Sequence, residues 1–562
     1  MGERGRGGRL RGAGQAFASN WRNSDLRRAQ LSFLGAWTAE WAFTVALGIV
    51  AYRDGGAAAV GFVGLLRMLP SALLAPLLSP IADRGRRERV LILVSTVRGA
   101  ATAAVGVVVA FAGPIALVYL LAVVSTIAAT LYRPAHSALL PSLCRTGSEL
   151  ASANMVRGLL DSAATVLGPL LAAVLLQFAG VDAVFGVAAA ASFAAAALLM
   201  RLRYEAPPRP AATTAPNIAK EAVEGLRAVG RNRGLVLMLT LVAAQGLTRG
   251  ALTVLSVVVA IELLATGEPG VGALMTAVGV GAVAGSLGAS LLVGTARLGS
   301  WFAVGIALWG LPIALVGVFP DQAAALVLLS FVGVGNALVD VAGFTLIARL
   351  APETVLARVF GVVESLIAVF GGLGGVVAAA LIDGFGIEFA LIAIGLLCPV
   401  LAAASWWRLR RLDRSVATLD SDVALLRRVS MLTPLPLPSI EQLARGLQPV
   451  AVASGATVFA QGELGDRYYV IESGEVDVVR DGRVVAELGP GEGFGEIALL
   501  RPTGRLASVV ARGDLRLRAL ASDCFLPVVL GYTPSALEAA ATVDGIMSHY
   551  EPEDPAKHPP TS

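Results

Sequence analysis

The sequence has few of the residues that build redox, metal or nucleotide-hydrolysis sites. Its three cysteines, Cys144, Cys398 and Cys524, lie far apart and form no C-x-x-C pair, so they support neither a disulfide framework nor a zinc site. Its two lysines, Lys220 and Lys557, do not follow glycine, so the G-x-x-x-x-G-K-[ST] loop is absent. This excludes a pump driven by ATP bound at such a loop. We expect no metal, no cofactor and no enzyme activity.

Charged residues are also sparse. They make up 15% of the 562 residues, whereas about 25% is typical of soluble domains. Hydrophobic residues make up 56%, and the formal net charge of +4 is too small to suggest a nucleic-acid partner. The composition excludes a disordered chain and a single soluble globule. It indicates an integral membrane protein in contact with lipid.

Apolar segments of membrane-spanning length recur from residue 29 onward. Each is close to the roughly 17–25 residues that cross a bilayer as a helix. We expect an all-α bundle of about twelve helices, at 29–52, 58–79, 90–112, 115–134, 154–178, 183–202, 234–261, 270–293, 300–319, 322–348, 360–382 and 386–407. Residues 1–28 are polar and arginine-rich without the apolar core of a signal peptide, so we expect a cytoplasmic N-terminal tail.

Arginine-rich loops alternate with loops that, apart from Arg53, are poor in basic residues. The basic clusters lie at 84–89, 201–233 and 408–414. By the positive-inside rule these loops and both termini are cytoplasmic, which predicts a multi-pass protein of the plasma (inner) membrane. The long loop 204–233 separates two six-helix halves, 29–203 and 234–407. That is the plan of a transporter with two pseudo-symmetric halves.

The segment SPIADRGRRERVLIL, residues 79–93, lies at the cytoplasmic end of the second expected span. It resembles the loop G-x-L-A-D-R-x-G-R-R between helices two and three of the major facilitator superfamily. Asp83 and Arg84 match, Arg87 belongs to the same basic run, and Ser79 replaces the first glycine. The resemblance implies a secondary active transporter in which these residues take part in the conformational change.

Three other segments are similar to the drug-efflux and siderophore-export branch of that superfamily. They are LGAWTAEWAFTVAL (34–47), LLRMLPSALLAPLLSPIADR (65–84) and LYRPAHSALLPSL (131–143). Gly168-Pro169 resembles the glycine–proline motif of drug/proton antiporters, although the Gly-Gly that follows there is absent. The alternative is a plain proline kink whose freed backbone groups are satisfied by neighbouring helices. The resemblance implies proton-coupled efflux of an amphiphilic small molecule.

Several charged residues fall inside the expected spans, where charge is costly and usually functional. They are Glu40, Arg67, Arg98, Asp161, Arg249, Asp340 and Glu364. A carboxylate in a desolvated cavity can take up and release a proton near neutral pH. The alternative is a fixed ion pair, such as Glu40 with an arginine, or snorkelling near helix ends. We place Glu40 and Asp340 first as proton carriers because they lie deepest in their spans.

Beyond residue 407 the composition becomes that of a soluble domain. Residues 408–430 predict a helical connector, 431–550 a small β-roll with flanking helices, and 551–562 a disordered tail. The expected strands are 457–460, 467–473, 475–488 and 507–512, and Asp481-Gly482 predicts a hairpin turn.

The stretch 455–510 resembles the cyclic nucleotide-binding domain of catabolite regulators and cyclic-nucleotide-dependent kinases. The matching motifs are F-G-E-x-A-L-L and R-x-A-S-V, which place the site at Gly495, Glu496, Ile497, Ala498, Arg505, Leu506 and Ala507. A short helix after Gly495 would cradle phosphate, Glu496 would accept from the ribose 2′-hydroxyl, and Arg505 would neutralise the cyclic phosphate. Leu506 replaces a small or hydroxyl residue, which favours cyclic AMP over cyclic GMP. The alternative is a domain that keeps the fold and binds nothing.

These features together predict a secondary exporter of a small molecule with a cytoplasmic cyclic-nucleotide sensor, whose C-terminal helix 534–550 closes over the base. A cyclic-nucleotide-gated channel is disfavoured because the chain has neither a T-V-G-Y-G-like filter nor a helix with arginine at every third position. Two alternatives stay open. One is a lipid or lysophospholipid transporter on the same scaffold, and the other is a cyclic-nucleotide receptor with an inactive transporter part.

Overall fold

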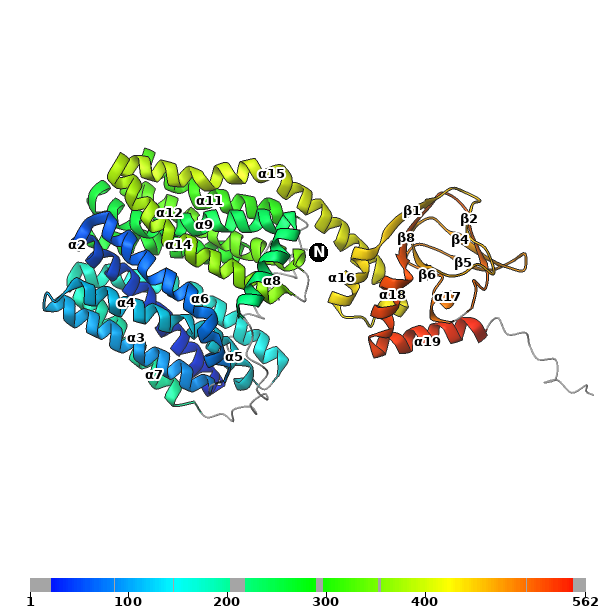
Figure 1. Cartoon of the computed structure of the whole chain (residues 1–562), viewed down its shortest axis with the longest axis horizontal. Coiled ribbons are helices and arrows are strands. Elements are labelled where there is room, and N and C mark those ends of the chain that lie inside the picture. Colours follow the sequence, from blue (N-terminus) through cyan, green and yellow to red (C-terminus); the bar gives the residue numbers. More distant parts are fainter. Residues whose placement is uncertain are drawn as a thin grey trace, which may run out of the picture. The chain divides into compact units, whose positions relative to one another are not determined.

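The computed structural model describes most of the chain. The described residues are 22–84, 86–144, 146–202, 218–289, 297–351, 355–501 and 503–548. The chain divides into two compact units, Met1–Arg410 and Arg411–Ser562 (Figure 1). The greater part of the expected N-terminal tail, the proline-rich part of the loop 204–233 and the expected tail 551–562 lie outside the described residues.

The first half of the bundle consists of α2 to α7, coloured blue to cyan in Figure 1. The bounds are α2 Ser24–Arg84, α3 Arg87–Ala110, α4 Ile115–Thr130, α5 Tyr132–Leu143, α6 Gly147–Phe178 and α7 Val181–Met200. α2 begins before residue 29 because a side chain caps it. Asn23 Oδ1 accepts the main-chain N–H groups of Asp25 and Leu26, both at 3.2 Å.

α2 contains two membrane crossings. At 61 residues it is roughly 90 Å long, about three times the hydrocarbon thickness of a bilayer. It bends at Gly55 and Gly56, whose dihedral angles are not helical, and Gly56 has a φ of 61° that favours glycine. Among the described residues, eleven helices are long and apolar enough to cross a membrane. With two crossings in α2, this confirms the expected bundle of about twelve.

The second half consists of α8 to α15 and contains two π-helical turns. The bounds are α8 Ile218–Arg231, α9 Arg233–Val258, η1 Val259–Leu263, α10 Gly267–Ala289, α11 Leu298–Val318, α12 Gln322–Leu338, η3 Val339–Gly343, α13 Phe344–Leu350, α14 Leu356–Phe385 and α15 Ile387–Leu426. The turn η3 lies inside the span that α12 and α13 form together. Turns of this kind frequently mark functional positions in helices, and η3 contains Asp340.

Small residues let the helices approach closely. A Cβ placed on Gly281 of α10 would lie 1.7 Å from the carbonyl oxygen of Ser330 on α12. A Cβ on Gly61 of α2 would lie 2.5 Å from the carbonyl oxygen of Gly375 on α14, across the two halves. Without a hydrophobic force between helices in lipid, contacts of this kind provide much of the association energy.

The second unit consists of eight short strands and five helices among its described residues, and it also contains the end of α15. The bounds are η5 Ser430–Leu432, α16 Leu437–Gly446, β1 Gln448–Val452, β2 Thr457–Phe459, β3 Arg467–Ser473, β4 Val476–Arg480, β5 Arg483–Leu488, β6 Gly493–Phe494, α17 Ile497–Leu500, β7 Ser508–Ala511, β8 Leu515–Ala521, α18 Ser522–Leu530 and α19 Thr533–Ser548.

The strands pair antiparallel in two four-stranded sheets, ordered β1-β8-β3-β6 and β2-β7-β4-β5. Asp481 and Gly482 have φ values of 50° and 77°, and they form the tight turn of the β4–β5 hairpin as expected. Strands β1, β6 and β8 were not expected from the sequence. The observed class, a helical membrane bundle with a small β domain flanked by helices, confirms the expected fold.

Candidate functional sites

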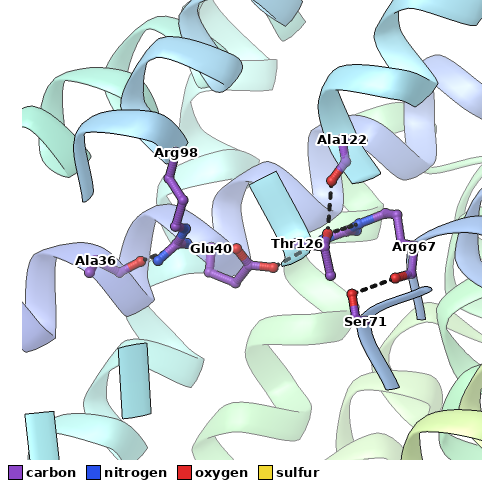
Figure 2. Close-up of polar contacts among 7 residues, drawn as sticks. All are labelled: Ala36, Glu40, Arg67, Ser71, Arg98, Ala122 and Thr126. Carbon is purple, nitrogen blue, oxygen red and sulfur yellow. Dashed lines mark hydrogen bonds and ion pairs between the residues drawn. The ribbon is translucent and has the colours of Figure 1, made fainter. Parts of the chain in front are cut away.

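Glu40 lies between two arginines in the interior of the first half. Its Oε1 accepts a hydrogen bond from Arg67 Nη2 at 3.0 Å, and its Oε2 accepts one from Arg98 Nη2 at 2.6 Å. Arg67 Nε also donates to Thr126 Oγ1 at 2.7 Å (Figure 2). The side chains of Arg67 and Arg98 are only 5% and 3% exposed, and that of Glu40 is 15% exposed. The triad therefore links both spans of α2 to α3 and α4 in a nearly dry environment.

A different cluster of polar groups lies on the second half. Arg249 on α9 donates to Asn336 Oδ1 on α12, and Asn336 Nδ2 donates to Asp340 Oδ2 at 2.9 Å. The guanidinium of Arg249 also lies over the ring of Trp309 on α11, with 5.4 Å from Cζ to the ring centroid. Arg249 and Asp340 are exposed, unlike the Glu40 triad. The protein's own helices therefore do not enclose this cluster as they enclose the Glu40 triad.

The first half carries a matching cluster around Asp161. Arg133 on α5 donates through Nη2 to both carboxylate oxygens of Asp161 on α6, at 3.0 and 3.2 Å. The guanidinium of Arg133 lies 4.3 Å from the ring centroid of Trp37 on α2. The side chains of Arg133 and Asp161 are 53% and 33% exposed. Each half thus presents an arginine that is placed over a tryptophan and linked to an aspartate.

The clusters of the two halves interact electrostatically with each other. Asp340 interacts with Arg133 and Asp161 of the first half as well as with Arg249 of its own half. Because the charges of the two halves are within reach of each other, the exposed surface lies between the halves. Intramembrane charges at such a position typically mark a substrate or ion pathway.

Two arginines of this region were missed by the sequence analysis. Arg133 and Arg157 lie near the ends of their expected spans and were not considered as candidates. Arg157 Nη1 donates to Ser137 Oγ at 3.1 Å, and Arg157 interacts electrostatically with both Arg133 and Asp161. The i, i+4 spacing of Arg157 and Asp161 on one helix was the available signal.

The other sequence candidates are distributed as follows. Glu364 is exposed on α14. Arg87 at the start of α3 donates to the carbonyl oxygen of Ala138 at 2.7 Å, which ties α3 to α5. Asp83 and Arg84 belong to the end of α2, and their side chains lie outside the described residues.

Gly168 and Pro169 lie where α6 meets helices of both halves. A Cβ on Gly168 would lie 2.7 Å from the carbonyl oxygen of Thr38 on α2. A Cβ on Gly272 of α10 would lie 2.6 Å from the carbonyl oxygen of Pro169. The pair therefore belongs to a close junction of three helices, two from the first half and one from the second.

In the β domain, the expected ligand residues gather around β6 and the turn before β7. Gly495 follows β6 with a φ of 93°, which turns the chain so that Glu496 occupies the N-cap position of α17, without a capping hydrogen bond from its side chain. Arg505 Nη1 donates to the carbonyl oxygen of Gly495 at 2.7 Å, and Arg505 Nη2 donates to that of Arg467 at 2.8 Å. The Arg505 guanidinium lies 4.1 Å from the ring centroid of Phe459. These contacts bring Glu496 and Arg505 to one place.

Glu496 and Arg505 are buried, and each keeps one polar atom without a partner. They are 6% and 4% exposed. Glu496 Oε2 and Arg505 Nε have no hydrogen-bond partner among the described residues. Burial raises the pKa of the Glu496 carboxyl and lowers that of the Arg505 guanidinium. Unsatisfied buried groups of this kind destabilise the folded state. The free acceptor on Glu496 and the free donor on Arg505 therefore fit a ligand that supplies both a hydroxyl and an anionic group.

The remaining expected ligand residues surround that pair. Ile497 and Ala498 form the first turn of α17, and Leu506 and Ala507, both half-buried, follow Arg505. The end of α17 is joined to α19, because Arg501 pairs with Asp544. The C-terminal helix that the sequence places over the ligand thus contacts the segment that contains Glu496.

Comparison with protein families gives two matches in different parts of the chain. Residues 31–300 match the Major Facilitator Superfamily, and residues 449–531 match the family described as Cyclic nucleotide-binding domain. The first match begins inside α2 and ends in the first turn of α11, and the second covers all eight strands apart from the first residue of β1. Neither match is to a family of enzymes.

Individual relatives match between about a sixth and a quarter of the chain. A cAMP-dependent protein kinase regulatory subunit of Schizosaccharomyces pombe is 38% identical over 103 residues, which are 18% of this chain and 25% of that protein. An uncharacterised protein of Mycobacterium tuberculosis is 46% identical over 99 residues, 18% of either chain. The regulatory domain of Toxoplasma gondii PKA, co-crystallised with cAMP, is 26% identical, with a TM-score of 0.21, over 23% of this chain and 52% of that chain. The chain therefore spans about a quarter or less of these two curated relatives.

Proposed function

We propose that this chain, a major facilitator superfamily transporter domain joined to a C-terminal cyclic nucleotide-binding domain, exports an amphiphilic small molecule in exchange for protons under the control of cyclic AMP. The observation that carries the transport part is a pair of aspartates, one on each half: the half-buried Asp161 and the exposed Asp340. Each is linked to an arginine of its own half, directly or through Asn336.

The arrangement supports proton coupling by a simple electrostatic argument. When an aspartate binds a proton, its attraction to the neighbouring arginine is lost, and that arginine becomes available to a substrate. A proton then changes the relative stability of conformations in which the two halves present these groups differently. Glu40 has a different role in this proposal. It is a fixed ion-pair centre, because two arginines hold both of its oxygens in a nearly dry environment.

Transport into everted membrane vesicles tests this part of the proposal. Asp340→Asn and Asp161→Asn are expected to abolish or strongly reduce the dependence of flux on an imposed pH gradient, while Asp383→Asn at the exposed end of α14 leaves it intact. If both aspartate variants keep full proton coupling, proton exchange through this cluster is wrong. Counterflow in the same vesicles separates an active transporter from a receptor whose transporter part is inactive.

The regulatory part rests on the open pair Glu496 and Arg505. A ribose cyclic phosphate offers a 2′-hydroxyl to the carboxylate and a phosphate to the guanidinium, so it satisfies both buried atoms at once. The relatives named as cAMP-dependent regulatory subunits support cyclic AMP, and Leu506 disfavours cyclic GMP. In this proposal the protein is in the plasma membrane, and both of its termini are cytoplasmic, where cyclic AMP is available. Calorimetric titration of cyclic AMP and cyclic GMP tests binding and preference directly.

A further inference from the structure

The exposed cluster between the two halves contains more positive than negative charge. Among the described residues that interact there, three are arginines, Arg133, Arg157 and Arg249, and two are aspartates, Asp161 and Asp340. The excess lies in the first half, where Arg133 and Arg157 share the single carboxylate of Asp161. Two like charges at close range repel each other and any cationic ligand.

Hydrogen bonding at Arg157 is also incomplete. Its Nη1 donates to Ser137 Oγ, but its Nε is buried and lacks an acceptor within the described part of the chain. Guanidinium groups preferentially bind carboxylate and phosphate through two parallel N–H groups. An unsatisfied guanidinium beside a second arginine therefore matches an anionic group that is not part of the protein.

The surroundings of this arginine pair are aromatic. Arg133 lies over the ring of Trp37, whose indole Nε1 is buried without a hydrogen-bond partner among the described residues. Phe33 lies against the same tryptophan, with ring centroids 6.1 Å apart. Phe33 itself is buried in the core, so an anionic head bound by the arginines would have the ring of Trp37 beside it. An aromatic ring beside a binding site for an anionic group favours an amphiphile over a small inorganic anion.

We infer that the transport site takes an anionic amphiphile, whose carboxylate or phosphate head binds between Arg133 and Arg157 with its apolar body toward Trp37. The inference rests on the proposed transport function and names its substrate class. Arg249 and Trp309 give the second half a similar arginine–aromatic pair. In this inference the head group moves from the arginines of one half to the arginine of the other during the conformational change. Asp161 and Asp340 then pair with the arginines that the head group no longer occupies.

Binding to the full-length protein in lipid nanodiscs tests the inference. The probes are octanoate, octyl phosphate and octyltrimethylammonium, which share a chain length and differ in head charge. Affinity is read from quenching of tryptophan fluorescence, corrected with empty nanodiscs, and from the shift in unfolding temperature. We expect at least one of the two anions to bind about tenfold tighter than the cation or better. The comparison of octanoate with octyl phosphate separates a carboxylate head from a phosphate head.

Variants assign the preference to the arginine pair. Arg157→Gln is expected to remove the preference for the anion, and Arg157→Lys to keep part of it, because lysine retains the charge without the planar fork. Arg358→Gln is the matched control, since Arg358 pairs with Glu224 at 2.9 Å outside the cluster. The unfolding temperature without probe shows that each variant is folded.

Three results would overturn the inference. They are equal or tighter binding of the cation, an unchanged anion preference in Arg157→Gln, and no binding of any probe. The failure of the transport function looks different, because it appears as loss of pH-driven flux and counterflow in vesicles. A protein that keeps flux dependent on Asp340 but prefers the cation refutes the substrate class alone.

Discussion

Gly168 on α6 packs so closely against Trp41 on α2 that a Cβ placed on Gly168 would lie 2.4 Å from the Cβ of Trp41. The main chain of α2 is equally near, since the carbonyl oxygen of Thr38 would lie 2.7 Å away. An added methyl group cannot be accommodated by a flexible side chain and must move a helix. The glycine of the Gly168-Pro169 pair is therefore required by packing, whatever further role the motif has.

Gly168→Ala is expected to destabilise the bundle by about 1–3 kcal/mol, the usual cost of overpacking a close contact, and to slow transport because α6 also borders α10. The control is Gly158→Ala on the same helix, where an added Cβ has no heavy atom within 4 Å. Unfolding temperatures and initial transport rates of the two variants provide the measurement. Equal effects of both substitutions would contradict the packing argument.

Glu40 and Asp340, which the sequence ranks together, are expected to respond differently to neutralisation. Glu40→Gln leaves Arg67 and Arg98 without their carboxylate in a dry environment, and removal of one partner of a buried ion pair costs about 3–5 kcal/mol. Asp340→Asn removes an exposed carboxylate, so its effect on stability is expected to be small and its effect on proton-coupled flux large. Thermal unfolding and pH-gradient flux, measured on both variants, distinguish them. A stable Glu40→Gln variant without proton coupling would show that Glu40 carries the proton and is not a fixed ion pair.

Much of the membrane bundle is predictable from composition because a span must be apolar over its whole length. The break at Gly55 and Gly56 falls between the expected spans 29–52 and 58–79, so its place is predictable, whereas the continuation of the helix on both sides of the bend is not. The sequence identified Glu40, Arg67 and Arg98 as intramembrane charges and left open an ion pair of Glu40 with an arginine. It did not show that both arginines are the partners, since they lie 27 and 58 residues away. Pairing at such separation depends on helix packing, which no local pattern encodes.

The β domain shows a similar division. The hairpin at Asp481-Gly482 is a local signal and was found, whereas β8 pairs with β1 and β3 over long separations and was missed. Glu496 and Arg505 were predicted from family motifs. The carbonyl groups of Gly495 and Arg467 accept hydrogen bonds from Nη1 and Nη2 of Arg505, which leaves its Nε without an acceptor. Only the folded domain shows this.

Glu496 predicts a pH dependence of the unliganded domain. Burial raises the pKa of its carboxyl above the usual value of 4.5. Between that value and the higher folded-state pKa, the folded domain binds more protons than the unfolded chain, so stability falls as pH rises through this window. Glu496→Gln lacks this titration. The variant of the 411–562 domain is therefore expected to gain stability relative to the native domain as pH rises, by about 1–3 kcal/mol at most.

The same substitution is expected to weaken cyclic AMP binding, because glutamine cannot offer the ribose hydroxyl a charged acceptor. Ligand binding favours the ionised carboxylate, so the affinity of the native domain should fall when pH is lowered into the titration window. Thermal unfolding as a function of pH, with and without cyclic AMP, measures both effects. A Glu496→Gln domain that is less stable than the native one across this range would show that the carboxylate is satisfied in the folded state.

Arg505 is the residue at which the proposed control of transport by cyclic AMP can be tested. Removal of one partner of a charge-assisted contact costs roughly 2–5 kcal/mol, so Arg505→Ala should lower the affinity for cyclic AMP at least about thirtyfold. Arg505→Lys keeps the charge but not the planar guanidinium, so its affinity should lie between those of the native domain and Arg505→Ala. Arg483→Ala on the exposed edge of β5 should bind cyclic AMP normally.

In vesicles, cyclic AMP is expected to change the transport rate of the native protein modestly and that of Arg505→Ala not at all, with basal flux retained. If millimolar cyclic AMP gives neither heat nor a melting shift with the native domain, the regulatory proposal is wrong. The transport proposal is unaffected by that result, because Asp161 and Asp340 belong to the other unit.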